Sequence, residues 1–209
     1  MNFGDLFKTQ NSRKMTQVSM AALIKGARSG SLVSFPTDTV PAFAVQPDRS
    51  ELIFAAKQRQ QDKPLILMGA NASDLWHFVK GSPAEWQIWQ QVADQYWPGA
   101  LTLVLPASAS VPKAMNPSDP TTIGLRVPNS GVALSILSQT GPLATTSANR
   151  SGEPPLETMA EIAAQFPDVL TLLPSKLETT LTAGVPSTVA KWTGSGWEIL
   201  RQGAVKLVV

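Results

Sequence analysis

The residues with the clearest capacity for chemistry lie between Thr145 and Pro154, in the stretch TTSANRSGEP. The stretch follows a short apolar run, residues 142–144, which is typical of the end of a buried strand. Small hydroxyl side chains let a ligand approach the backbone closely, and the amide of Asn149 can both donate and accept hydrogen bonds. An ordinary polar turn has a similar composition, so the stretch by itself leaves a turn and a ligand-binding loop equally open.

A second polar loop, residues 36–41 (PTDTVP), follows the apolar residues 32–35 near the N-terminus. The polar residues that fall at expected strand ends or in loops are Thr39, Lys57, Arg59, Lys63, Arg126, Ser147, Asn149, Ser187 and Arg201. Taken singly, each cation is a solvated surface charge. Where the loops of an open α/β sheet converge, however, several such groups can bind one ligand. Guanidinium, ammonium and hydroxyl groups in one place favour an anion with many oxygens, such as a nucleoside triphosphate.

The sequence contains neither G-x-x-x-x-G-K nor G-x-G-x-x-G, the two glycine-rich patterns that hold phosphates by backbone amides. A phosphate site in this protein would therefore be built from side chains. Residues 108–121 form a proline-punctuated stretch that is long enough to act as a mobile lid over such a site.

The elements that must position these residues alternate along the chain. Periodic apolar residues predict helices at 16–28, from Asp48 to about 59, at 72–79, 84–96, 132–137 and 157–165. Apolar runs bounded by turn residues predict strands at 32–35, 64–68, 101–105, 123–127, 169–173, 187–191 and 197–200. Alternating strands and helices indicate an α/β sheet. The last strands have no helix between them, which favours some antiparallel pairing and hence a mixed sheet.

Length and composition bound the class of protein. A chain of 209 residues with 43 % apolar and 15 % charged residues is large enough for one well-packed domain. Its formal net charge of +2 excludes a strongly basic nucleic-acid protein, although a local basic patch remains open. The absence of cysteine excludes disulfides, zinc ribbons and thiol catalysis. The single histidine, His77, stands among large apolar residues and is interpreted as a packing or surface residue.

Residues 1–15 are polar and lack the apolar region of a signal peptide, so they are predicted to be a flexible leader, with residues 16–209 forming the domain. No apolar run approaches the length of a membrane span. We therefore expect a cytoplasmic protein without membrane contact. The tryptophans at 76, 86, 89 and 97 are interpreted as packing residues in preference to base-stacking platforms.

Seven short motifs, in order, resemble the YrdC-like family of threonylcarbamoyl-AMP synthases within the Sua/YciO/YrdC superfamily. They are FPTDTV (35–40), KQR with KPL (57–59, 63–65), WPG with LTLV (97–99, 101–104), LRVP (125–128), SANRSG (147–152), PSTV (186–189) and LRQG (200–203). Each motif alone is weakly specific. Their common order covers roughly residues 16–205, which is most of the chain.

The resemblance implies a single-domain α/β fold of the YrdC/RibB-like type, with a twisted mixed sheet flanked by helices and a positively charged concave cavity. The family's K-x-R and S-x-N pairs face that cavity, which assigns catalytic roles to Lys57, Arg59, Ser147 and Asn149. It also implies that threonine is bound by Thr39, Arg126, Ser147 and Ser187. For ATP it implies Arg59, Lys63, Thr122, Asn149, Glu157 and Arg201, with Glu157 the weakest of these assignments.

The reaction implied by the resemblance joins L-threonine, bicarbonate and ATP into threonylcarbamoyl-AMP and releases pyrophosphate. The product serves threonylcarbamoyladenosine modification of tRNA through a downstream threonylcarbamoyl transferase complex. No carboxylate cluster suggests a dedicated metal site, so Mg²⁺ is expected to arrive with the ATP phosphates.

The chain departs from the family pattern at three places. Pro41-Ala42 replaces the usual Tyr-Gly, Gln60 replaces the usual Pro, and residues 179–184 (TTLTAG) replace a glycine-rich segment. The C-terminal extension of longer members is also missing, which indicates the short, single-domain type. Two other functions therefore stay open: a non-catalytic module that binds double-stranded RNA or tRNA on a basic concave face, and a paralogue that acts on a different adenylate.

Overall fold

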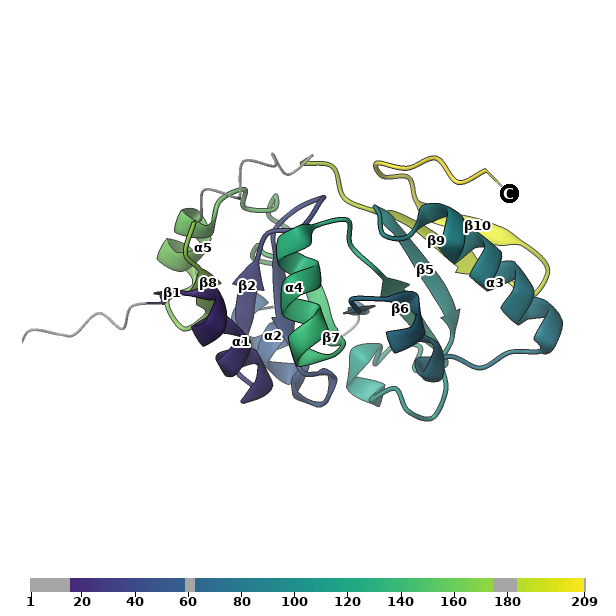
Figure 1. The fold of residues 1–209 in the computed structure, drawn as a ribbon, viewed down its shortest axis with the longest axis horizontal. Coiled ribbons are helices and arrows are strands. Elements are labelled where there is room, and N and C mark those ends of the chain that lie inside the picture. The colour runs from purple at the N-terminus through teal and green to yellow at the C-terminus, as the bar shows by residue number, and fades with distance from the viewer. Residues whose placement is uncertain (1–15, 59–62, 175–183, 209) are drawn as a thin grey trace, which may run out of the picture.

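The computed structural model describes residues 16–58, 63–174 and 184–208. These residues form one ten-stranded mixed sheet with the strand order β1-β8-β2-β3-β7-β4-β6-β5-β9-β10 (Figure 1). The strands are β1 (Gln17–Val18), β2 (Val33–Phe35), β3 (Ala42–Val45), β4 (Ile66–Met68), β5 (Leu101–Pro106), β6 (Thr122–Arg126), β7 (Leu143–Ser147), β8 (Leu170–Leu172), β9 (Thr188–Trp192) and β10 (Trp197–Arg201). The pairs β1/β8, β2/β8, β4/β6 and β5/β9 are parallel and the remaining pairs are antiparallel. The predicted mixed α/β sheet is confirmed, including antiparallel pairing of the last two strands. The predicted leader, residues 1–15, lies outside the described residues.

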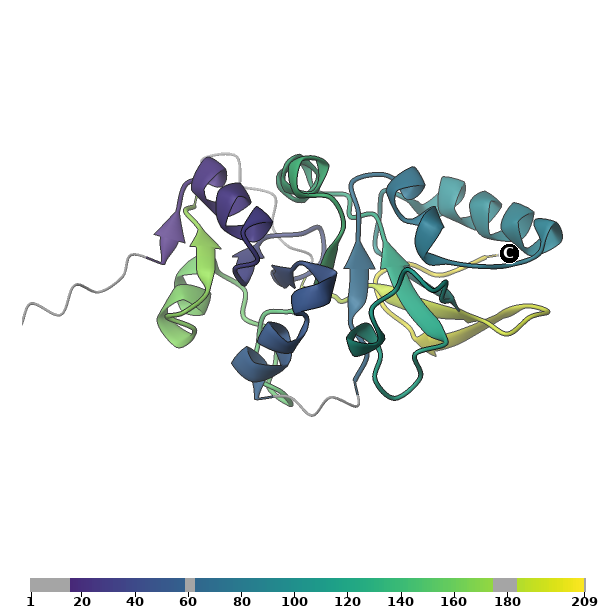
Figure 2. The same ribbon diagram turned by 90° about the horizontal axis from the view of Figure 1, so that it is seen from below.

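Helices cover both faces of the sheet unevenly. They are α1 (Met20–Arg28), α2 (Glu51–Lys57), α3 (Pro83–Tyr96), α4 (Gly131–Thr140) and α5 (Met159–Gln165), with short 3-10 turns η1 (Pro47–Arg49), η2 (Ala72–Asp74), η3 (Trp76–Phe78) and η4 (Lys113–Met115). Figure 2 shows α1, α4 and α3 along one face, while α2 and α5 lie on the other. Among the described residues, none of these five α-helices covers the second face over the β6-β5-β9 region (Figure 2).

Local capping explains where the main helices begin. Ser19 accepts a hydrogen bond from the backbone of Ala22 at the start of α1. Ser82 and Glu85 form a reciprocal capping box at α3, and Thr158 with Glu161 does the same at α5. These caps satisfy backbone N–H groups that a first helical turn leaves without partners.

The core lies between the sheet and its helices and is built from continuous apolar strands. Phe35, Phe43, Leu67, Leu103 and Leu125 are each at most 1 % exposed. Burying a side chain of this size stabilises the fold by roughly 1.5–3 kcal/mol. The core therefore fixes the strand order, and with it the positions of the polar residues at the strand ends.

Four sequence-based predictions differ from the structure. Val18 belongs to strand β1 and not to the first helix, because Ser19 caps the helix after it. The strand β3 was not predicted: its four residues are all buried, so no polar–apolar alternation marks it. Asp48 lies in η1, and α2 begins only after Ser50. Residues 72–79 form two 3-10 turns instead of a helix, since the backbone becomes extended at Val79.

The loop TTSANRSGEP also begins later than its sequence suggests. Strand β7 continues through Ser147 because residues 144–147 pair with β3. Thr145 and Ser147 are therefore held on a sheet, which gives them fixed directions.

The tryptophans pack, as predicted. All six form one series of ring contacts between the α3 region and strands β9 and β10: Trp97, Trp76, Trp86, Trp89, Trp192 and Trp197. His77 is exposed and lies beside Phe78, with ring centroids 3.7 Å apart.

Candidate functional site

One face of the sheet carries two adjoining cavities. Residues that lie directly opposite one another on paired strands point to the same face. Strand register thus places Thr145, Ile66, Gly124, Val104 and Lys191 in one row across β7, β4, β6, β5 and β9. The first cavity, about 320 Å³, lies over the β3-β7-β4 end of this row, and the second, about 480 Å³, lies over the β6-β5-β9 end. Pro64, Ile66 and Arg201 line both, so the two cavities form one continuous hollow.

The first cavity is centred on the guanidinium of Arg126, which is 4 % exposed. Its Nη2 lies 2.6 Å from a carboxylate oxygen of Asp38, its Nη1 donates to the hydroxyl of Thr39 at 2.9 Å, and its Nε donates to the backbone oxygen of Gly99 at 3.0 Å. Among the described residues, these bonds use three of the five guanidinium N–H donors. The others can bind an anion in the cavity that Arg126 lines.

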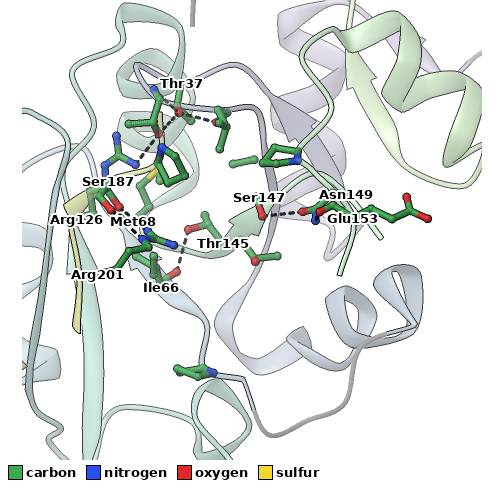
Figure 3. Close-up of a pocket in the computed structure, with 17 residues that line it drawn as sticks. Thr37, Ile66, Met68, Arg126, Thr145, Ser147, Asn149, Glu153, Ser187 and Arg201 are labelled. Atoms are coloured by element: carbon green, nitrogen blue, oxygen red, sulfur yellow. Dashed lines mark hydrogen bonds between the residues drawn. The ribbon is translucent and has the colours of Figure 1, made fainter. Parts of the chain in front are cut away.

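A second guanidinium, that of Arg201, lines both cavities. Arg201 donates to the backbone oxygen of Ser187 at 2.9 and 3.1 Å and to its hydroxyl at 3.3 Å (Figure 3). Burial lowers the pKa of both arginines, and for Arg126 the nearby Arg201 lowers it further, against the raising effect of Asp38. Two guanidinium groups that repel each other would be stabilised by a carboxylate or phosphate bound between them.

Ser147 and Asn149 form the opposite wall of the first cavity, and Figure 3 shows a hydrogen bond between their side chains. Behind them lies Lys57, which is 2 % exposed. Its ammonium donates to the backbone oxygens of Ser147 and Asn149 at 2.5 and 2.7 Å and to the side-chain oxygen of Asn149 at 2.8 Å. The helix α2 therefore delivers its last side chain underneath the loop.

The second cavity has an exposed and a partly buried lysine on its lining. Lys63 is exposed at its edge, and Lys191 reaches it from β9. Thr122 lines it and contacts both Asn116 and Asp119. The pKa of Asp119 is lowered, chiefly by a hydrogen bond from Thr121, with a smaller contribution from Lys191. These groups suit a larger ligand with several anionic oxygens.

The structure brings together most of the residues that the sequence singled out. The first cavity is lined by Thr39, Arg126, Ser147, Asn149, Ser187 and Arg201, and the second by Lys63, Thr122 and Arg201. Two other candidates do not line either cavity. Lys57 lines neither cavity, because its ammonium is engaged beneath the loop. Glu157 is exposed and lines neither cavity, because it precedes α5 on the outer surface. Arg59 and Gln60 lie outside the described residues.

Several polar residues that line the hollow were not singled out from the sequence, among them Thr37, Asp119 and Lys191, nor was Asp38, which lines neither cavity but pairs with Arg126. Lys191 had a usable signal, because the alternation along residues 188–192 places it on the same face as Val189. Of the departures from the family pattern, Ala42 lines the first cavity, and Gly184 donates its N–H to the backbone oxygen of Thr39. The other residues of the 179–184 departure lie outside the described part of the chain.

Within the described residues, no cluster of three or more histidine, aspartate or glutamate side chains is placed to hold a metal ion. No helix in the same part of the chain has the length and apolar character needed to cross a membrane.

Comparison with known proteins places this geometry in a family. The family model for Sua5, YciO and YrdC, described as telomere recombination, matches residues 25–203. A Pyrococcus abyssi protein named threonylcarbamoyl-AMP synthase is 35 % identical over 184 residues, which is 86 % of this chain and 52 % of that protein. A Yersinia pestis protein of the same name is 30 % identical over 158 residues, covering 74 % of this chain and 82 % of that protein. This chain thus spans about half the length of the Pyrococcus relative.

Solved structures of proteins named Sua5 and YciO are also similar to this chain. The structure of P. abyssi Sua5 complexed with L-threonine superposes with a TM-score of 0.78 at 31 % identity, covering 88 % of this chain and 54 % of that one. Escherichia coli YciO superposes with a TM-score of 0.76 at 21 % identity over 90 % of each chain, which supports the fold alone. With a family model matching most of its length, the chain belongs to the Sua5/YciO/YrdC family.

Proposed function

We propose that this protein is an L-threonylcarbamoyladenylate synthase, a nucleotidyltransferase that joins L-threonine, bicarbonate and ATP and releases pyrophosphate. Relatives that carry the name threonylcarbamoyl-AMP synthase support the activity. The observation that carries the proposal is the division of the hollow. Residues expected to bind threonine line the smaller cavity, several of those expected to bind ATP line the larger one, and Arg201 stands between them.

The first cavity fits an amino acid. Arg126 and Arg201 offer guanidinium N–H groups to a carboxylate, and Thr39, Ser147 and Ser187 surround it with hydroxyls. The P. abyssi Sua5 structure with L-threonine supports threonine as the amino acid. A bound carboxylate would relieve the repulsion between the two arginines, which gives the site a preference for an anionic end group.

The second cavity fits the nucleotide. Lys63, Lys191, Arg201 and Thr122 line this cavity, and the three cations would neutralise the phosphates. We include Arg59 among the phosphate ligands on the strength of its motif, whereas Asn149, which the resemblance also assigned to ATP, lines only the first cavity. Mg²⁺ would enter as part of the MgATP substrate, bound mainly through the phosphates.

The chemistry requires positioning more than acid–base catalysis. The threonine amine attacks bicarbonate, and loss of water leaves a carbamate. A carbamate oxygen then attacks the α-phosphorus, and pyrophosphate leaves with the bond electrons. Carbamate and triphosphate repel each other, so cations on both sides of the junction lower the barrier by holding them in line. Arg201, which lines both cavities, is placed for this role.

The product is a mixed anhydride of a carbamic acid and a phosphate, which reacts readily with amines. We propose that a threonylcarbamoyl transferase complex passes its acyl group to an adenosine of tRNA, completing threonylcarbamoyladenosine. Direct contact between this protein and tRNA is not required for that sequence.

The test is an assay of purified protein with ATP, Mg²⁺, bicarbonate and labelled threonine. We expect pyrophosphate release that depends on both threonine and bicarbonate, together with a labelled adenylate. Omission of bicarbonate is the internal control. ATP-dependent adenylation of a different acid would favour the paralogue. RNA binding that weakens steeply with salt, without binding of ATP or threonine, would favour the RNA-binding module.

A further inference from the structure

Lys57, the first residue of the KQR motif, is directed into the protein and lines neither cavity. It is the last residue of α2 and is almost fully buried. An ammonium group has three N–H donors, and those of Lys57 have three loop oxygens within 2.5–2.8 Å. The ring centroid of Phe43 lies 5.7 Å from the ammonium nitrogen of Lys57. The ammonium of Lys57 is therefore part of the wall behind Ser147 and Asn149 and is bound to the loop.

In Asn149, the next residue of this network, both the oxygen and the nitrogen of the side-chain amide form two hydrogen bonds each. Its side-chain oxygen accepts from Lys57 at 2.8 Å and from the hydroxyl of Ser147 at 2.7 Å. Its side-chain nitrogen donates to the backbone oxygens of Arg150 and Glu153. The ammonium on one side and two carbonyls on the other fix the amide in one orientation, because a flip would oppose donors with donors and acceptors with acceptors.

The fixed amide determines what Ser147 can offer. A hydroxyl has one hydrogen, and that of Ser147 is donated to Asn149. Toward the cavity that it lines, Ser147 can therefore only accept a hydrogen bond.

The hydroxyls of the 36–41 loop follow the same logic. Thr37 donates its hydrogen to the backbone oxygen of Val40 at 2.7 Å, so in the Thr37–Thr39 contact at 3.1 Å the donor is Thr39. Thr39 in turn accepts from Arg126. The first cavity thus has the acceptor oxygen of Ser147 on one wall and the guanidinium groups of Arg126 and Arg201 on the other, with the hydroxyl of Thr39 beside Arg126. This polarity matches the ammonium and carboxylate ends of an α-amino acid.

We propose that Lys57 is a positioning residue for the amino-acid substrate, acting through Asn149 to hold Ser147 as a hydrogen-bond acceptor for the substrate amine. The identity of the substrate as threonine rests on the proposed function. A fixed acceptor also suits the reaction, because it orients the nitrogen lone pair by binding a hydrogen of the amine, whereas a donor would compete for that lone pair.

The experiment compares two ligands that differ at one group: L-threonine and 3-hydroxybutanoate of matching configuration, in which hydrogen replaces the ammonium. Calorimetry would measure both, and ATP separately, on the wild type and on Lys57→Met, Asn149→Ala and Ser147→Ala. We expect each variant to bind threonine about tenfold more weakly, the effect of one hydrogen bond to a charged group. Affinities for 3-hydroxybutanoate and for ATP should stay within about twofold.

Three results would overturn the proposal. Lys57→Met or Asn149→Ala could weaken ATP binding and spare threonine, which would make the residue a phosphate ligand. Ser147→Ala could weaken both acids equally, which would remove the selective contact with the amine. Lys57→Met could leave threonine binding unchanged. If Lys57→Met does not fold, Asn149→Ala breaks the same network at its second member and decides the question. Failure of the wild type to bind either threonine or ATP would instead refute the proposed function.

Discussion

The two halves of the hollow offer a ligand different physical means of binding. In the first cavity, Arg126 is buried and anchored to Asp38, and the hydrogens of Thr39 and Ser147 are already committed. In the second, Lys63 is an exposed cation and Lys191 is only partly buried. A preorganised, desolvated site recognises one small molecule by the direction of its hydrogen bonds. An open cationic surface attracts any polyanion, and salt screens it.

From this difference we infer which cavity determines substrate specificity. The first cavity should choose the amino acid, and its variants should have large effects that depend little on salt. The second should supply electrostatic attraction to the nucleotide, and its variants should have small effects that shrink as salt rises.

The largest expected effect comes from Arg126→Met. The substitution removes the carboxylate contact and leaves Asp38 without its buried ion-pair partner. We expect a loss of roughly 10²- to 10³-fold in kcat/KM for threonine, as for other preorganised charge contacts. Steady-state kinetics measures it, together with melting temperature. Asp38→Asn in the same chain should recover stability without recovering activity. Unchanged threonine kinetics in Arg126→Met would show that the carboxylate binds elsewhere.

Arg201→Gln should affect both halves at once. Because Arg201 lines both cavities, its loss should raise KM for threonine and for ATP by about tenfold each, the size of one charge-assisted contact. The matched control is Lys80→Gln, which removes an exposed cation that lines neither cavity. If only one substrate responds, Arg201 serves one half and the two cavities are not joined in function.

Lys191→Gln should act on the nucleotide alone. We expect KM for ATP to rise severalfold, about 2- to 5-fold at low salt, and the difference from wild type to fade as ionic strength increases. The threonine KM should not change, because Lys191 lines only the second cavity. Kinetics at low and high salt, with Lys25→Gln as a distant exposed control, measures the effect. A loss that persists in high salt would mean that the second cavity is as preorganised as the first.

The smallest expected effect belongs to Glu157→Gln. The side chain is exposed and lines neither cavity, so we expect less than about a twofold change in KM for ATP, as for most exposed substitutions. A larger change would place Glu157 at the nucleotide after all and extend the second cavity toward α5 (Met159–Gln165).

Much of the fold could be predicted from local pattern. The helix at 84–96 and the strands at 101–105 and 123–127 carry clear apolar signals, and all three are present. Strand β3 could not be found this way, since a short run that is buried on both faces has no period to detect. Yet β3 pairs with β7 and thereby aligns the 36–41 loop with Ser147, so the missed strand is what brings the two polar loops together.

For the site, residue types and their order along the chain determined the candidates: hydroxyls at 39, 147 and 187, and cations at 57, 63, 126 and 201. Only the tertiary structure decided where each of these side chains lies. It turned Lys57 inward and divided the other residues between two adjoining cavities. The physical reason is that the type of a side chain is a local property of the sequence. The direction in which a side chain points, and the residues that surround it, depend on the register between paired strands that lie far apart in the sequence.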